Sequence, residues 1–314
     1  MSTNGAMSIN TNSADSLREQ VILANREFYK EIARKYDRYE SCACDEFFQR
    51  GVEADLDVIQ KSLDKRPNPV RCLDCGGGTG NLTLKMLRRG WEVTVVDVSP
   101  DMLAILQQKV AATGNTAVFI NDSVENFLAN SSERFDVVSF SSVLHHLFSP
   151  IAVVAGAANR ISRGGFFYSV FDPVIPSSRF AARLFSTLDT VLAKLFYDRD
   201  DFFPGLYRRL RKTGSAHDAA HGRPIVSPGD LAEYHAHKGL DDRLFALTLE
   251  REGFSVDIQR YPVGRTSLLR SVNSRVRALL NFRILAQRLS VPTRAGFENQ
   301  GNTQAAIPPA PVPK

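Results

Sequence analysis

Three glycines at alternate positions, Gly76, Gly78 and Gly80, follow the apolar run Val70–Cys75 and precede Asn81. Glycine lets the chain turn tightly and lets a ligand press against the backbone, while free N–H groups at a helix start attract acceptor groups. A dinucleotide-binding turn would need glycine at position 81. The spacing therefore predicts a nucleotide-type ligand without a pyrophosphate site, and a tight turn that binds nothing is the alternative.

Polar side chains also follow the next two apolar runs. Asp97 ends one run, where a carboxylate can accept hydrogen bonds from both ribose hydroxyls. Asp122 and Ser123 follow the other run, where a short acidic side chain can bind an adenine amine, although such a pair also caps helices. Together with the glycine turn, these positions predict a ligand that contains ribose and adenine.

An alternation of strand and helix patterns positions these residues and predicts a parallel α/β sheet. The expected strands are Val70–Cys75, Glu92–Val96, Ala117–Ile120, Phe135–Phe140 and Gly165–Phe171. The expected helices between them are Asn81–Arg89, Ser99–Ala112, Val124–Ala129 and Pro150–Ile161. After a long interruption, the pattern resumes with a helix and two strands, at Asp241–Glu252, Ser255–Tyr261 and Arg265–Leu269.

Composition divides the chain into further segments. In chain order we expect a disordered leader (1–16), N-terminal helices (17–64), the core (65–173), an insertion (174–240), the end of the core (241–270), a basic C-terminal helix (271–295) and a disordered tail (296–314). The insertion begins with an apolar helical face within Arg179–Phe196 and continues with a long polar stretch. We find no internal repeat.

The bulk properties of the 314 residues are those of a soluble enzyme. No apolar run approaches the ~18–20 residues that span a bilayer, and the start of the chain lacks a secretory signal, so cytoplasmic residence is expected. The pairs Cys42/Cys44 and Cys72/Cys75 suggest zinc or redox chemistry only weakly, because the second pair lies in an apolar strand. No metal site is predicted.

The strongest charge asymmetry lies near the C-terminus. Eight arginines and no acidic residue occur between Asp257 and Glu298, while the net charge of +5 is mild for this length. The stretch Ser271–Leu289 combines arginines with apolar residues. We expect a helix there that either packs on the sheet or contacts an anionic membrane or a protein partner.

The motifs resemble those of the class I S-adenosylmethionine (SAM)-dependent methyltransferases, within the small-molecule group that includes ubiquinone- and menaquinone-biosynthesis-like enzymes. The resemblance covers about Tyr29–Gly165 and Asp241–Leu269. It rests on Val70–Gly80, Val96–Leu103, Phe135–Val138, Val143–Leu147 and Arg163–Gly165. It implies a Rossmann-like seven-strand, mostly parallel sheet with helices on both faces, an insertion after strand five that covers the substrate, and SAM as the cofactor.

By this resemblance, the cofactor is bound by residues from the loops after the first four strands and from the N-terminal helix. Asp97 takes the ribose, Asp122 and Ser123 take the adenine, and Ser141 lies near the methionine moiety. Cys75-Gly76-Gly77 departs from the usual pattern, but the extra glycine is permissive. The remaining cofactor residues implied are Tyr36, which closes over the cofactor, and Gly76, Gly77, Gly78, Gly80, Val98 and Met102.

Methyl transfer needs an aligned acceptor and, for a hydroxyl acceptor, removal of its proton. His145 and His146 follow strand four at the carboxyl edge of the sheet, where an imidazole can titrate near neutral pH. Either one is a candidate general base, although the Leu-His-His-Leu stretch recurs in the resembling family without always being catalytic. Weaker candidates in the insertion are His217, His221, His235 and His237.

We therefore expect methyl transfer to a small organic molecule, with oxygen favoured as the methylated atom and a hydrophobic acceptor body. A nucleic-acid methyltransferase is the first alternative. It is disfavoured because base amino-methylation calls for an Asp/Asn-Pro-Pro-Tyr-like segment where Ser141–Leu144 stands. A non-catalytic SAM-binding scaffold is the second alternative. The acceptor, the pathway and the oligomeric state are left open by the sequence.

Overall fold

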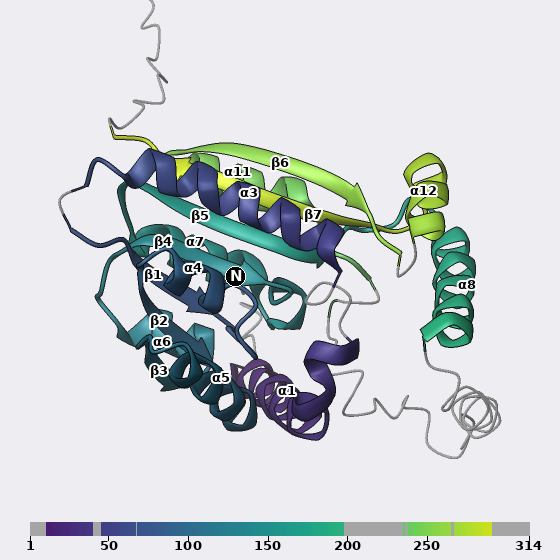
Figure 1. The fold of residues 1–314 in the computed structure, drawn as a ribbon, viewed down its shortest axis with the longest axis horizontal. Helices are drawn as coiled ribbons and strands as arrows, with labels where there is room; N and C mark the ends of the chain where they lie inside the picture. The colour runs from purple at the N-terminus through teal and green to yellow at the C-terminus, as the bar shows by residue number, and fades with distance from the viewer. Residues whose placement is uncertain are drawn as a thin grey trace, which may run out of the picture.

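Seven strands pair into one sheet within the described residues, which are 11–39, 45–66, 68–197, 235, 238–264 and 267–290 of this computed structural model (Figure 1). They are β1 (Arg71–Cys75), β2 (Glu92–Asp97), β3 (Val118–Asn121), β4 (Phe135–Ser141), β5 (Ile161–Pro173), β6 (Phe254–Pro262) and β7 (Leu280–Arg288). Their order is β3-β2-β1-β4-β5-β7-β6, with β7 antiparallel to both neighbours and the other pairs parallel. The predicted mostly parallel α/β class is confirmed.

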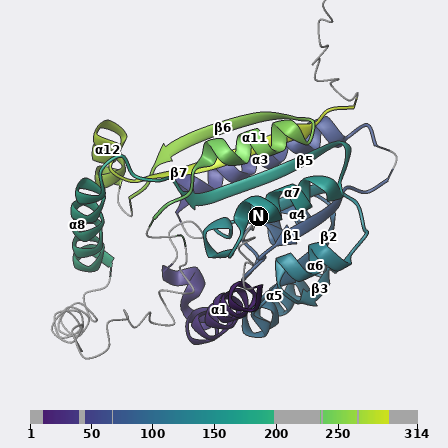
Figure 2. The same cartoon turned by 180° about the vertical axis from the view of Figure 1, so that it is seen from behind.

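Helices cover both faces of this sheet (Figure 2). One face carries α3 (Glu46–Leu63), α4 (Thr83–Arg88) and α5 (Pro100–Ala112), and the other carries α6 (Val124–Asn130), α7 (Pro150–Arg160) and α11 (Asp242–Arg251). Alternation along β1 divides its side chains between two cores, since Cys72 packs under the first set of helices and Leu73 under the second. The central strands β1, β4 and β5 are therefore buried on both faces, as their apolar runs predict.

Serine side chains begin two of the helices that border the carboxyl edge of the sheet. Ser99 Oγ accepts a hydrogen bond from the Met102 amide at 3.3 Å, and Ser123 Oγ accepts one from the Asn126 amide at 3.1 Å. These N-caps satisfy amides that have no partner within the helix. They fix where the loops after β2 and β3 end.

The cysteines of β1 behave as small apolar residues. Cys72 and Cys75 are free thiols with no exposed surface, and burial raises the pKa of both well above the usual value. The expectation of buried, unreactive cysteines is confirmed for this pair. Cys42 and Cys44 lie outside the described residues.

The N-terminal helix is longer than its sequence pattern indicates. Helix α1 spans Thr11–Tyr39, so residues 11–16, which were expected in a disordered leader, begin the helix instead. It lies beside α5 at one end of the sheet (Figure 1). Residues 1–10 lie outside the described part.

The C-terminal expectations are wrong in two places. The expected strand Arg265–Leu269 overlaps a helix, α12 (Ser267–Val276), and the expected helix Ser271–Leu289 ends at Val276 and gives way to β7. Phe282, Ile284 and Ala286 are fully buried at alternate positions of β7, which is strand periodicity. Residues 280–288 therefore do not form the expected basic helix, and contact of this region with a membrane or a partner stays a prediction. Residues 291–295 of that expected helix lie outside the described part.

Strand five also extends further than predicted, from Ile161 to Pro173 rather than Gly165–Phe171. The following segment contains α8 (Arg179–Tyr197), where a helix was expected, and residues 198–234 lie outside the described part. Phe185 of α8 packs against Leu269 of α12, and the two helices lie together at one end of the molecule in both views (Figures 1 and 2). No helix in the described ranges is long and apolar enough to cross a bilayer.

Candidate active site

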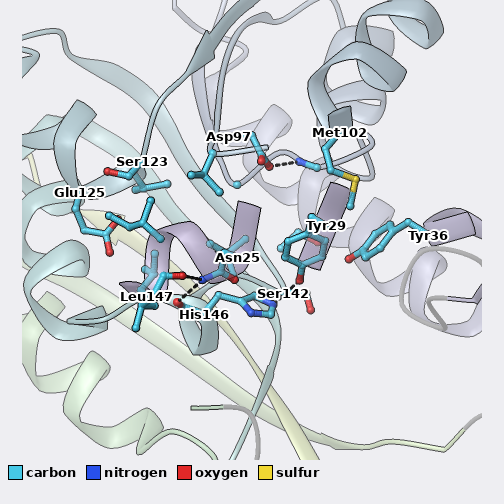
Figure 3. A pocket seen from close by; sticks show the side chains of 18 residues that line it. Asn25, Tyr29, Tyr36, Asp97, Met102, Ser123, Glu125, Ser142, His146 and Leu147 are labelled. Carbon is cyan, nitrogen blue, oxygen red and sulfur yellow. Dashed lines mark hydrogen bonds between the residues drawn. The ribbon is translucent and has the colours of Figure 1, made fainter. Parts of the chain in front are cut away.

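A cavity that opens to solvent lies between the carboxyl edge of the sheet and α1 (Figure 3). The loops after β1, β2, β3 and β4 form one wall, which we call the loop wall. Side chains of α1 and of η1 (Leu144–His146) form the opposite wall, which we call the helix wall.

The glycine turn after β1 supplies the floor of the loop wall. Gly78 has a φ of 54°, in the left-handed region, and a Cβ built on it would meet nothing nearer than the Gly76 carbonyl at 3.9 Å. A ligand can therefore lie directly on the Gly78 backbone. Gly76 also lines the cavity, and a side chain there would collide with Val143 at 2.6 Å.

Two other glycines of the turn serve packing instead. A Cβ on Gly77 would meet Val95 at 2.4 Å, and one on Gly80 would meet Leu106 at 2.3 Å. Neither glycine is part of the cavity lining. Their predicted place against the cofactor stays a prediction, and in this structure they let the turn pack on β2 and α5.

Asp97, at the end of β2, is the buried carboxylate of the loop wall. Its two oxygens accept hydrogen bonds from the Gly78 amide and the Ser99 amide, each at 2.8 Å. Burial raises the pKa of this carboxyl, and the two amide donors act in the opposite direction. Asn121 donates to the carbonyl groups of Asp97 and Val98 at 2.9 and 3.1 Å, which holds the strand end in place.

Asp74 lies one layer below the glycine turn. Its carboxylate accepts hydrogen bonds from the Thr83 hydroxyl at 2.6 Å and the Ser139 hydroxyl at 2.9 Å. Burial raises its pKa to about 6, against the lowering effect of these hydrogen bonds. This carboxylate joins β1 to α4 and β4, and so supports the turn from beneath.

The loop after β3 contributes less directly than expected. Ser123 lines the cavity while its hydroxyl caps α6. Asp122 instead lines a neighbouring hollow beside the cavity. Its carboxylate oxygens accept hydrogen bonds from the Ser123 amide at 2.7 Å and from the Asn126 side chain at 2.6 Å. This hollow shares Ile22, Val98 and Ser123 with the cavity.

The helix wall presents a series of α1 side chains at helical spacing. Asn25, Tyr29 and Tyr36 line the cavity, and the ring centroids of the two tyrosines lie 6.0 Å apart (Figure 3). The end of α1 is tied to the opposite wall, because Asp37 accepts hydrogen bonds from Thr79 and from Lys109 of α5. Lys109 also donates to the Thr79 carbonyl at 2.9 Å.

His146 and Tyr29 meet across the helix wall. The Tyr29 hydroxyl lies 2.7 Å from His146 Nε2, and the two rings are edge-to-face with centroids 5.5 Å apart (Figure 3). Both residues line the cavity. A phenol hydrogen-bonded to an imidazole can pass a proton to it, so this pair is the candidate acid–base group.

His145 has a different environment from its neighbour. It is buried, its Nδ1 lies 2.8 Å from Asp172 Oδ1, and it is not part of the cavity lining. His235 donates its backbone N–H to the His145 carbonyl at 2.9 Å. His217, His221 and His237 lie outside the described residues.

Asn25 carries an acceptor atom that the protein leaves unused. Its side-chain nitrogen donates to the carbonyl groups of Val21 and His146, at 2.9 and 3.3 Å, which fixes the amide orientation. The side-chain oxygen is buried and has no hydrogen-bond partner. A buried acceptor without a partner costs ~1–3 kcal/mol, so its place on a cavity residue indicates a ligand with a donor group.

The residues present fit an adenosyl cofactor. An open turn at Gly78 and a buried carboxylate at Asp97 lie side by side in the loop wall of one cavity. The predicted cofactor and base residues that line the cavity are Tyr36, Gly76, Gly78, Asp97, Val98, Met102, Ser123, Ser141 and His146. Those outside the lining are Gly77, Gly80, Asp122 and His145.

Sequence reasoning missed Asn25, Tyr29 and Glu125, which also line the cavity. The first two lie four residues apart on α1, and Tyr36 lies seven residues beyond Tyr29. Such spacing places all three on one helix face, a signal that was available in the sequence. Nothing in the sequence indicates Glu125.

Part of the chain is similar in sequence to known methyltransferases. Residues 73–167 match a family described as a methyltransferase domain. Two curated relatives are ubiquinone biosynthesis O-methyltransferases. That of Proteus mirabilis is 35% identical over 95 residues, covering 30% of this chain and 39% of the relative. That of Vibrio vulnificus is 28% identical over 133 residues, covering 42% of this chain and 57% of the relative.

A solved structure supports the fold over a longer range. It is the plantazolicin methyltransferase BpumL in complex with a triazolic desmethylPZN analog and SAH, with a TM-score of 0.50 and 16% identity over 88% of this chain and 99% of that chain. At this identity the similarity concerns the fold. Residues 73–167 thus match a methyltransferase domain, and the sheet around them has a fold similar to that of a solved methyltransferase. The chain matches 39% and 57% of the lengths of these two curated relatives.

Proposed function

We propose that this protein transfers a methyl group from SAM to an oxygen atom of a small organic molecule with an apolar body. The observation that carries the proposal is one cavity with a nucleoside-type loop wall and, opposite, a tyrosine–histidine pair. The apolar side chains of α1 in the cavity lining favour a small organic molecule over a nucleic acid as the acceptor.

The loop wall would hold the cofactor. Asp97 accepts the ribose hydroxyls, Gly78 leaves room for the chain of the methionine moiety, and Gly76 and Ser141 line the cavity beside it. Met102 and Ser123 flank the adenine side, and Tyr36 closes over the cofactor from α1. Bound SAM supplies an electrophilic methyl group on a sulfonium ion.

The helix wall would orient the acceptor. Val21, Ile22, Val143 and Leu147 give this part of the cavity an apolar surface, which suits a hydrophobic acceptor body. Asn25 offers its unused oxygen to a hydroxyl or N–H group on the acceptor. Alignment of the acceptor is the main task, because methyl transfer from a sulfonium needs little other assistance.

The tyrosine–histidine pair would remove the acceptor proton. A hydroxyl acceptor must lose its proton when the new oxygen–carbon bond forms. The Tyr29 oxygen can accept that proton as its own passes to His146 Nε2, over the 2.7 Å that separates them. The relatives named as O-methyltransferases support oxygen as the methylated atom.

Incubation of the full chain with methyl-labelled SAM and a small-molecule extract of its host tests the proposal. We expect label in a low-molecular-weight O-methyl product identified by mass, and loss of that product with His146→Ala. Label confined to RNA, DNA or protein would contradict the proposal. Binding of SAM without any transfer would instead support the scaffold alternative.

A further inference from the structure

The last residues of β5 depart from regular strand geometry. The pairing with β7 shifts between Val170 and Asp172, and Phe171 has a φ of 72°, where residues other than glycine are uncommon. Such a conformation costs on the order of 1–3 kcal/mol and persists only where its surroundings impose it. Here Phe171 N–H donates to the Tyr261 hydroxyl at 3.0 Å, and the Asn281 side chain donates to the Phe171 carbonyl at 3.2 Å.

The irregularity changes which side of the sheet Asp172 faces. Ser169 and Asp172 are three positions apart, so in a regular strand they would point to opposite faces. The extra residue of a bulge brings both to one face, where the Ser169 hydroxyl donates to Asp172 Oδ2 at 3.1 Å. Phe171 remains on the other face and packs in the core beneath α3.

The redirected carboxylate binds His145 at two points. Asp172 Oδ1 accepts the backbone N–H of His145 at 3.1 Å and lies 2.8 Å from its ring Nδ1. Asp172 has no exposed surface. A carboxylate oxygen can only accept hydrogen bonds, so Nδ1 of His145 must donate to Asp172 Oδ1. The proton of the neutral His145 ring therefore lies on Nδ1.

His145 is in turn joined to the helix wall. Its ring centroid lies 4.0 Å from that of His146, which follows it in η1, and His146 contacts Tyr29 within the helix wall. Fixing the backbone and ring of His145 therefore limits where the His146 ring can lie. His145 itself is not part of the cavity lining.

We propose that Asp172 and His145 are positioning residues, and that the bulge at Phe171 exists to aim Asp172 at His145 and so hold His146 against Tyr29. This inference rests on the proposed function, because it assigns the acid–base role to His146. It separates two adjacent histidines into one that faces the reactants and one that acts through its neighbour.

Three variants of the full chain test this arrangement. His145→Asn keeps a donor N–H near the place of Nδ1 without a titratable ring, His145→Leu removes that donor, and Asp172→Asn weakens the acceptor. We expect His145→Leu and Asp172→Asn to lower kcat about tenfold to a hundredfold, the scale of a small misplacement, with little change in SAM affinity. We expect His145→Asn to recover most of the turnover lost in His145→Leu.

Nitrogen-15 spectra of selectively labelled histidine, recorded with SAH bound, provide a readout without turnover. The wild type should show His145 with the proton on Nδ1, and Asp172→Asn should move the signals of both His145 and His146. If His145→Asn were as inactive as His145→Leu while His146→Ala stayed active, His145 would contact the acceptor and the proposal would fail. Unchanged turnover in all three variants, or unmoved His146 signals in Asp172→Asn, would also overturn it. If the wild type transfers no methyl group at all, the proposed function fails while the spectra still decide the positioning role.

Discussion

The two walls of the cavity are built from different kinds of structure. The loop wall uses backbone turns and one buried carboxylate, and its residues Gly76, Gly78 and Asp97 lie at the carboxyl ends of strands that are neighbours in the sheet. The helix wall uses side chains, and Tyr29 meets His146 across 117 residues of chain. A short sequence motif is enough to specify the loop wall. The helix wall forms only when segments that are distant in the sequence pack together. Variants on the two walls should therefore fail in different ways.

Asp97→Ala should have the largest effect, on the loop wall. It removes the acceptor for the ribose and frees the amides of Gly78 and Ser99, so SAM affinity should fall by about 10³-fold or more, since hydrogen bonds to charged groups contribute ~1.5–3 kcal/mol each. Calorimetric titration measures this change. Asp101→Ala, an exposed position in the first turn of α5, is the control and should bind normally. Wild-type affinity in Asp97→Ala would contradict the role of this wall.

His146→Ala should break the helix wall and leave the loop wall intact. Loss of the acid–base group should lower turnover by about 10²–10⁴-fold, with SAM affinity within about threefold of wild type. Steady-state kinetics with the identified acceptor, together with a SAM titration, would separate the two effects. A loss of turnover below about fivefold would leave alignment of the acceptor as the mechanism, without a base.

Asp74→Asn should change how the stability of the protein depends on pH, because the Asp74 carboxylate lies beneath the loop wall and supports it. The folded pKa of Asp74, about 6, lies above the usual aspartate value of 3.8, so the native state keeps a proton that the unfolded chain releases between these pH values. Native stability from this group is therefore present below about pH 4, falls as pH rises, and is lost above about pH 6, by about 3 kcal/mol in total.

Urea denaturation from pH 4 to 7.5 checks this expectation. The free energy of unfolding of the wild type, minus that of Asp74→Asn, should decrease across the window by an amount of this order. Parallel pH profiles for the two proteins would show that Asp74 does not titrate abnormally.

The sequence predicts the loop wall well because its chemistry depends on local order. Gly76, Gly78 and Asp97 each come at the end of an apolar run, so their place at the edge of the sheet can be predicted even when the strand bounds are off by a residue or two. Strands β1 to β5 follow the predicted alternation. The distinction between His145 and His146 could not be predicted. The distinction depends on the bulge at Phe171, which has a left-handed backbone conformation. Glycine is the residue that signals this conformation in a sequence, and position 171 is a phenylalanine.

The C-terminal region shows how non-local pairing defeats a local pattern. Leu279, Leu280 and Leu285, among arginines, suggest an amphipathic helix, yet the segment inserts between β5 and β6 as an antiparallel strand. Arg283 then pairs with Asp55 at 3.1 Å and Asp257 at 2.7 Å rather than facing an anionic surface. The helical spacing of Asn25 and Tyr29 is likewise visible in the sequence, but only the packing of α1 over the sheet turns that face toward a cavity.

The central claim is that the cofactor lies on the Gly78 backbone, and a comparison of two glycines tests it most directly. Gly78 and Gly90 both have positive φ and open space around a built Cβ, but Gly78 lines the cavity, whereas Gly90 is exposed between α4 and β2. Valine at either position imposes a similar backbone penalty. A difference in SAM affinity between the two variants therefore measures the effect of filling the cavity. In calorimetric titrations with SAM, Gly90→Val should bind as the wild type does and Gly78→Val should show no binding. Equal affinity in the two variants, or no binding by the wild type, would contradict the account.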